Sequence, residues 1–194
     1  MVLSPYANHG SSMKNALICV FVLCALAMPA QERKSPSKLK MPGPATQNLL
    51  LGTWSIRVEY RSMPGTPKGV GVGEESWRIG PGGASLIEDY RETNSQQSIT
   101  GMGILWWDSD AGGNRVLWCE STSSPGCKLL NGLGNWEGEQ LVIKATEIID
   151  GKPVVLREVF SEITTDRFKQ ELFSGPNEQS LVRLLTIRGK RKGF

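Results

Sequence analysis

The sequence predicts an all-β protein, specifically an antiparallel up-and-down β-barrel of about eight to ten strands. Apolar and polar side chains alternate from Trp54 to Tyr60, with Trp54, Ile56 and Val58 on one face. This period of two is typical of a half-buried strand. After the N-terminal segment, no stretch repeats apolar residues at the helical period of 3.6 with capping residues at its ends. Folds that need crossover helices are therefore disfavoured.

Short runs of strand-like sequence continue to the end of the chain. They span residues 75–79, 85–92, 98–107, 115–120, 141–148, 154–160, 167–173 and 181–188. Gly, Asn, Asp and Pro separate these runs and supply the backbone angles that turns require, with Asp150-Gly151 as the clearest hairpin signal. We expect the strands to close into a barrel, because closure removes exposed edges. The glycine-rich segment 69–73 is expected to be a mobile loop or a strand bend.

The N-terminal 30 residues have the order of parts of a secretory signal peptide. Lys14 precedes the apolar run 16–27, which ends before Met28-Pro29-Ala30. A run of about 12 residues is shorter than the roughly 20 that span a bilayer, so we expect no stable membrane span after cleavage. Met13 is an alternative start of the precursor. The chain is therefore predicted to be exported, to the periplasm or the medium.

The mature chain is predicted to have two parts. Residues 31–47 are rich in Lys, Ser and Pro and are expected to form a flexible linker. Residues 48–190 are expected to form the barrel domain. In an oxidising compartment Cys119 and Cys127, the only cysteines of the mature chain, are predicted to form a disulfide; the alternative is two free thiols.

Charge and composition exclude several functional classes. The formal net charge is +3, and the one basic cluster lies at the C-terminus, so we expect a solvated tail and no nucleic-acid binding. The only histidine is His9, inside the segment that export would remove. The mature chain then has no Ser-His-Asp or Cys-His pair, no zinc site that needs imidazole and no His-ligated haem. No cofactor or metal is expected.

One acidic segment resembles a calcium-binding loop. Asp108, Asp110 and Asn114 have suitable spacing, but the position that would hold the bidentate Glu is Cys119. A plain hairpin turn is therefore the favoured interpretation.

Several motifs resemble known families. Gly52-Thr53-Trp54 enters the first strand, and Arg188 lies late in the chain where it could stack over the indole; this pattern resembles the calycin signature of lipocalin-like barrels. The order of the further motifs resembles an uncharacterised bacterial family, domain of unknown function 1579. These motifs are Asp89-Tyr90-Arg91, Gly101-x-Gly103 before Trp107-Asp108, Gly134-x-Trp136, Asp150-Gly151-Lys152-Pro153 and Arg157-Glu158-Val159-Phe160. The resemblance covers about residues 50–190 and implies a barrel fold without an assigned activity.

The function predicted from these features is the binding of a small hydrophobic or amphipathic molecule. Six tryptophans in a small domain suit an aromatic cavity. Tyr90, Trp107, Trp136 and Arg157 are the candidate cavity residues, with Arg157 suited to an anionic head group. Glu88 and Glu158 could face either the interior or solvent. Two alternatives stay open: a structural or protein-interaction module without a small ligand, and an enzyme that uses carboxylates, Tyr or Lys.

Overall fold

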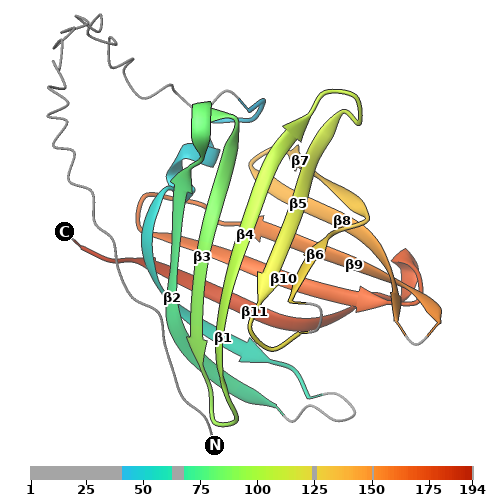
Figure 1. Cartoon of the computed structure of the whole chain (residues 1–194). Helices are drawn as coiled ribbons and strands as arrows, with labels where there is room; N and C mark the ends of the chain where they lie inside the picture. The colour runs from blue at the N-terminus through green and yellow to red at the C-terminus, as the bar shows by residue number, and fades with distance from the viewer. Residues whose placement is uncertain (1–40, 63–67, 124–125, 150, 194) are drawn as a thin grey trace, which may run out of the picture. The chain divides into compact units, whose positions relative to one another are not determined.

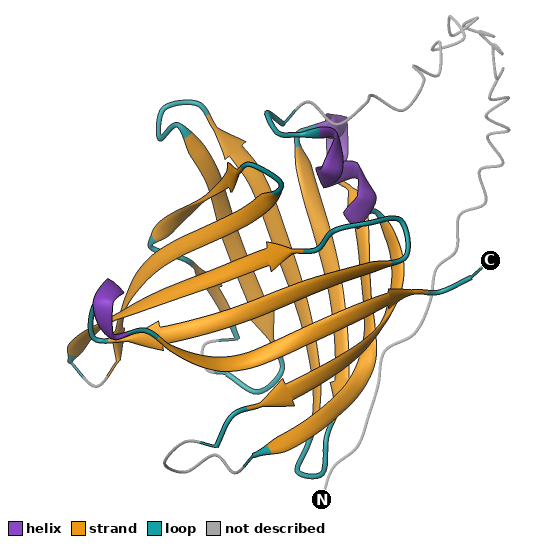
Figure 2. Ribbon diagram, turned by 180° about the vertical axis from the view of Figure 1, so that it is seen from behind, coloured by secondary structure: helices purple, strands orange, loops and turns teal. Residues whose placement is uncertain are grey.

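The computed structural model describes residues 41–62, 68–123, 126–149 and 151–193, which form a β-barrel (Figures 1 and 2). The predicted signal peptide and residues 31–40 of the predicted linker lie outside the described residues. The strands are β1 (Gly52–Tyr60), β2 (Gly69–Ile79), β3 (Ser85–Thr93), β4 (Ser98–Asp108), β5 (Gly113–Glu120), β6 (Cys127–Leu129), β7 (Gly132–Glu137), β8 (Gln140–Ile149), β9 (Lys152–Ser161), β10 (Arg167–Gly175) and β11 (Val182–Arg191). Three short 3-10 helices are η1 (Ala45–Leu50), η2 (Pro81–Gly83) and η3 (Glu178–Ser180).

The barrel closes in up-and-down order. Apart from β6 and β7, strands that follow one another in the sequence pair antiparallel, and β1 pairs with β11. Both β6 and β7 pair with β5, through Leu117–Leu129 and Asn114–Gly134, so they share one position and the barrel has ten strand positions. The predicted all-β antiparallel barrel is confirmed.

Side-chain alternation sorts each strand into an inner and an outer face. In β1, Trp54, Ile56 and Val58 are buried while Ser55 and Arg57 are exposed, as the sequence alternation predicts. Because successive residues of a strand point to opposite faces, the cross-strand register extends this inner face around the barrel. For example, Trp54 lies opposite Glu75 in β2, and Glu75 lies opposite Tyr90 in β3.

The glycine-rich segment is regular strand, which corrects the prediction of a loop or bend. Strand β2 begins at Gly69 and pairs with β1 over its whole first half. Gly71 and Gly73 fall on the inner face, where a Cβ atom would overlap the Glu92 side chain or the Arg91 carbonyl oxygen. These glycines are therefore explained by close packing with β3 and not by a turn.

One end of the barrel is covered by η1 and the residues before it. Met41, Thr46, Gln47 and Leu50 are buried there. The Trp54 indole Nε1 donates a hydrogen bond of 2.7 Å to the Leu50 carbonyl oxygen. Residues 41–47, which we expected to belong to the flexible linker, therefore pack on the barrel through the buried side chains of Met41, Thr46 and Gln47.

The arginine that stacks on Trp54 is Arg191, which corrects the expectation for Arg188. The Arg191 guanidinium lies 4.0 Å from the centre of the indole ring and donates to the Leu51 carbonyl oxygen at 2.7 Å. The register explains the difference, because Arg191 pairs directly with Trp54 whereas Arg188 pairs with Arg57 and is exposed.

The predicted disulfide between Cys119 and Cys127 is confirmed. It joins β5 to β6 across directly paired positions. We expect its removal to lower the free energy of unfolding by about 2–3 kcal/mol, because closing a loop of this length removes that much chain entropy from the unfolded state. Urea denaturation with and without reductant measures this difference. The Cys119→Ser/Cys127→Ser variant should show the same loss and no response to reductant; an unchanged midpoint on reduction of the wild type would contradict the prediction.

Candidate functional site

A cavity of about 420 Å³ lies inside the barrel. Its walls are mainly apolar: Tyr60, Trp77, Tyr90, Ile99, Ile104, Leu105, Val116, Trp118, Leu130, Leu141, Ile143, Leu156, Phe160, Leu172, Leu185 and Ile187. The exposed residues Gln97 and Thr122 also line it, so the cavity reaches solvent. They follow the ends of β3 and β5, near Tyr60 at the end of β1 and thus opposite the end that η1 covers. A cavity of this size falls in the range of small-molecule sites.

Three carboxyl groups point into the barrel: those of Glu75 in β2, Glu88 in β3 and Glu158 in β9. The Trp77 indole donates a hydrogen bond to Glu75, and the Gln170 amide donates one to Glu158. Glu88 and Glu158 line the cavity, and Glu158 keeps some accessible surface that faces it. Two acceptor atoms, Glu75 Oε2 and Gln170 Oε1, are buried without a hydrogen-bond partner among the described residues.

Burial raises the pKa of all three carboxyl groups. It raises the pKa of Glu75 to about 8, although the Trp77 hydrogen bond acts in the opposite direction. Burial, followed by repulsion from Glu75 and Glu158, raises the pKa of Glu88 well above its usual range. Burial also raises the pKa of Glu158. The physical cause is common to the three, because removing water disfavours the charged form.

Two further carboxylates lie near the open end, and each is held by aromatic donors. The Tyr60 and Tyr90 hydroxyls donate to Glu92 at 2.5 and 2.7 Å. Burial and the bond to Glu92 raise the pKa of both tyrosines beyond their usual range. The Trp118 indole donates to Glu120 at 3.1 Å. These two carboxylates therefore have hydrogen-bond donors that the protein itself provides.

The cavity combines apolar walls with acidic polar groups. Among the described residues that line it there is no lysine, arginine or histidine. Lys128 pairs with Glu147, and neither side chain belongs to the lining. This arrangement can surround an apolar molecule and offers it hydrogen-bond acceptors.

The structure places the predicted site residues in different parts of the barrel. Tyr90 lines the cavity. Trp107 and Trp136 are partly buried and pack against the core, but they do not belong to the lining. A Cβ atom on Gly43 would lie within 2.9 Å of the Trp136 indole nitrogen, which places Trp136 beside the segment that precedes η1.

Arg157 faces outward, which corrects the expectation that it reaches the interior. It pairs with Lys144 and Phe173 and lines a groove on the outer surface with Lys169 and Glu171. The reason is strand alternation: Glu158 points inward, so its neighbour points outward. The charged group that reaches the cavity from this strand is therefore a carboxyl and not a guanidinium.

The sequence interpretation missed several cavity residues. Trp77, Glu92, Trp118 and Glu120 line the cavity, and Glu75 is buried beside it. A usable signal is present, because acidic and aromatic residues alternate two positions apart in 75–77, 88–92 and 118–120. Residues two apart share one face of a strand, so an inward aromatic residue places its acidic neighbour inward as well.

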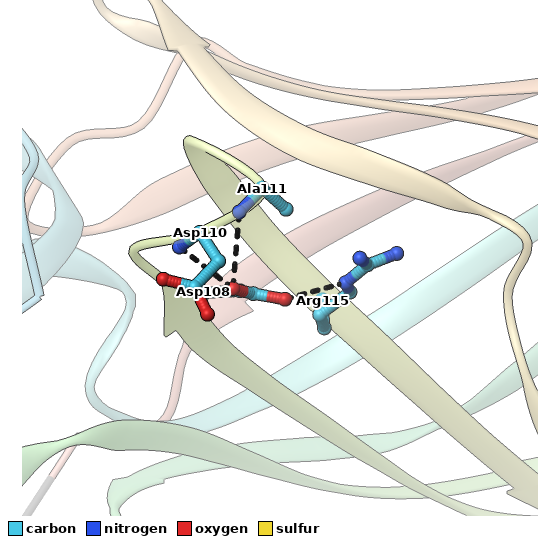
Figure 3. A network of polar contacts seen from close by, with 4 residues as sticks. All are labelled: Asp108, Asp110, Ala111 and Arg115. Carbon is cyan, nitrogen blue, oxygen red and sulfur yellow. Dashed lines mark hydrogen bonds and ion pairs between the residues drawn. The ribbon is translucent and has the colours of Figure 1, made fainter.

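The acidic segment that resembles a calcium loop is the β4–β5 hairpin turn, as we expected (Figure 3). One Asp108 carboxylate oxygen accepts hydrogen bonds from the backbone N–H groups of Asp110 and Ala111, at 3.0 and 3.1 Å. The other oxygen accepts one from Arg115 at 2.9 Å. The Arg115 bond and then the Ala111 N–H lower the pKa of Asp108. The carboxylate is thus used to build the turn.

Comparison with known proteins identifies the fold. No protein-family model and no curated protein matches the sequence. Among solved structures, the S-type phycobiliprotein lyase CPES from Guillardia theta matches with a TM-score of 0.51 and 11% identity, covering 76% of this chain and 90% of that chain. A redesigned β-barrel, mFAP0, bound to DFHBI matches with a TM-score of 0.40 and 14% identity, covering 74% and 99%. The likeness to the lyase shows a common antiparallel β-barrel fold.

Proposed function

We propose that this barrel binds a small, mainly apolar molecule in its interior cavity. The observation that carries the proposal is the cavity of about 420 Å³, which reaches solvent at one end and whose walls are aromatic and aliphatic. Apolar side chains that line an empty cavity lack van der Waals contacts on one side, and a bound ligand would supply these contacts. The lyase and the redesigned barrel have names that refer to phycobiliproteins and to DFHBI, which is compatible with a binding role for this fold. We assign the chain a binding role and no reaction.

We further propose that the protein is exported. The N-terminal sequence has the parts of a signal peptide, and the disulfide between Cys119 and Cys127 suits an oxidising compartment. In the part of the chain that the structure describes, no helix is long and apolar enough to cross a membrane. The motif order that resembles domain of unknown function 1579 supports membership of that family as a proposal.

The binding proposal is tested with N-phenyl-1-naphthylamine, a neutral apolar dye. We expect the wild type to bind one dye per chain, with energy transfer from Trp77 and Trp118, which line the cavity. Leu185→Trp should raise the dissociation constant of the dye roughly tenfold or more. Leu185 lines the cavity beside Tyr60, so an indole at this position would occupy the space of the ligand. Fluorescence titration gives both dissociation constants.

The matched control is Val72→Trp. Val72 lies on the outer face of β2 and is 57% exposed, so this variant adds the same side chain outside the cavity and should bind the dye as the wild type does. Absence of dye binding by the wild type, or equal loss in both variants, would contradict a site inside the barrel.

A further inference from the structure

We propose that the natural ligand carries a protonated amine, which Glu88 and Glu158 bind inside the barrel. This inference rests on the proposed function, since it requires a ligand in the cavity. It specifies the chemical class as a cationic amphiphile: an apolar body against the aromatic walls and an ammonium group on the inner carboxylates.

The interior of the barrel has a surplus of hydrogen-bond acceptors. None of the described residues donates a hydrogen bond to Glu88, and the Gln170 amide is the donor to Glu158. Glu75 Oε2 and Gln170 Oε1 are buried without partners in the described part of the chain. Buried polar atoms are normally paired, because an unpaired one loses its hydration without compensation. Of these groups Glu88, Glu158 and Gln170 line the cavity, so a ligand with several N–H donors could donate to them, and an ammonium group has three.

The ionisable side chains that line the cavity are carboxyl groups and tyrosines. Glu88 from β3 and Glu158 from β9 line the cavity, Glu75 lies close enough to raise the pKa of Glu88, and the described lining contains no basic side chain. The other charged or titratable groups that face the interior have partners in the protein. Tyr60 and Tyr90 donate to Glu92, Trp118 donates to Glu120, and Glu147 pairs with Lys128. A cation favours the charged form of the inner carboxyls and forms ion pairs with it, whereas an anion would favour their neutral form and would find no positive charge in the described lining.

Proton exchange gives this site a characteristic pH dependence. In the free protein, burial raises the pKa of Glu75 to about 8 and that of Glu88 well above its usual range, so these two groups hold protons at neutral pH. Burial also raises the pKa of Glu158. A bound ammonium favours their charged form and releases a proton to solvent. Amine affinity should therefore rise as the pH rises from 6 to 9, a range in which an alkylamine with a pKa of about 10 stays protonated.

The test compares two probes of nearly identical shape, 2-(1-naphthyl)ethylamine and 2-(1-naphthyl)ethanol. Each displaces N-phenyl-1-naphthylamine from the full-length protein at pH 6, 7.5 and 9. We expect the amine to bind roughly tenfold more tightly than the alcohol at pH 9, as a charge-assisted hydrogen bond exceeds a neutral one. The preference should shrink at pH 6. Calorimetry in buffers of different ionisation enthalpy should show proton release with the amine alone.

Two variants locate the effect. Glu88→Gln is close to isosteric with the protonated carboxyl, so we expect it to fold, to keep alcohol binding and to lose the amine preference. Asp89→Asn is the matched control, because Asp89 is the next residue and is exposed on the outer face. Equal binding of both probes by the wild type would overturn the inference while the cavity proposal stands. A preference that survives Glu88→Gln together with Glu158→Gln would also overturn it. Failure of both probes and the dye to bind would reject the proposed function itself.

Discussion

Replacing Trp54 with alanine is expected to lower the free energy of unfolding by about 3–5 kcal/mol, the range for truncating a buried tryptophan. Trp54 is fully buried and meets Phe168 edge to face, with ring centres 5.0 Å apart. Its indole nitrogen binds the Leu50 carbonyl oxygen, and its ring carries the Arg191 guanidinium. Alanine removes all three interactions, so the cover that η1 forms over this end loses its anchor. Urea denaturation followed by circular dichroism measures the change.

Trp106→Ala is the matched control for this prediction. Trp106 pairs with Ser85 and Arg115 and is only partly buried, on the face opposite to that of Leu105. Its truncation should cost clearly less than that of Trp54, since it leaves no enclosed cavity in the core. Equal losses for the two variants would show that Trp54 does not hold the covered end of the barrel in the way its contacts indicate.

The ligand-free protein is expected to lose stability as the pH rises from about 5 to 8. Glu75, Glu88 and Glu158 have raised pKa values in the folded state, so over this range the folded protein holds more protons than the unfolded chain. Between its unfolded and folded pKa values, such a carboxyl lowers the free energy of unfolding by about 1.4 kcal/mol per pH unit. For Glu75 the range runs from its ordinary value of 4.5 to about 8. The stabilisation that protonated Glu75 contributes is complete at pH values below 4.5 and is lost as the pH rises through about 8.

Groups with lowered pKa values act in a different range. The pKa values of Asp108, Asp166 and Glu171 are lowered, so their stabilising effect is present above their unfolded values and disappears only as the pH falls through the folded ones. This loss lies below about pH 4.5. It does not oppose the trend expected between pH 5 and 8.

Urea denaturation at several pH values tests the trend. Glu75→Gln should flatten the dependence, because the amide resembles the protonated carboxyl and does not titrate. Glu74→Gln is the matched control: Glu74 is the preceding residue, is partly exposed on the other face of β2 and pairs with Lys192, so its replacement should leave the slope unchanged. A wild-type stability that stays flat or rises between pH 5 and 8 would contradict the assignment of raised pKa values to the interior carboxyls.

The fold could be predicted from the sequence because alternation carries the necessary information. In segments such as Trp54–Tyr60 apolar and polar residues alternate strictly. The structure buries Trp54, Ile56 and Val58 and partly buries Tyr60. The glycine-rich start of β2 could not be recognised in this way. Gly71 and Gly73 have no side chain that could contribute to an alternating pattern. Glycine is needed at these positions because the Glu92 side chain and the Arg91 backbone of the neighbouring strand approach them closely.

The candidate site was less predictable because charge alone does not tell which face of a strand a residue occupies. Tyr90 was expected inside, and the same alternation places Glu88 and Glu92 inside with it, against the general tendency of glutamate to be exposed. Arg157 and Glu158 are adjacent, and only the pairing of β9 with β8 and β10 decides which one enters the barrel. In the same way the choice of Arg191 over Arg188 depends on the register between β1 and β11.

A crystal structure of the protein with N-phenyl-1-naphthylamine tests the central claim, a ligand site inside the barrel, most directly. We predict electron density for one dye molecule inside the barrel, between Trp77 and Trp118 and within reach of Glu88. Density for the dye only on the outer surface, with the interior closed by rearranged side chains, would contradict the claim.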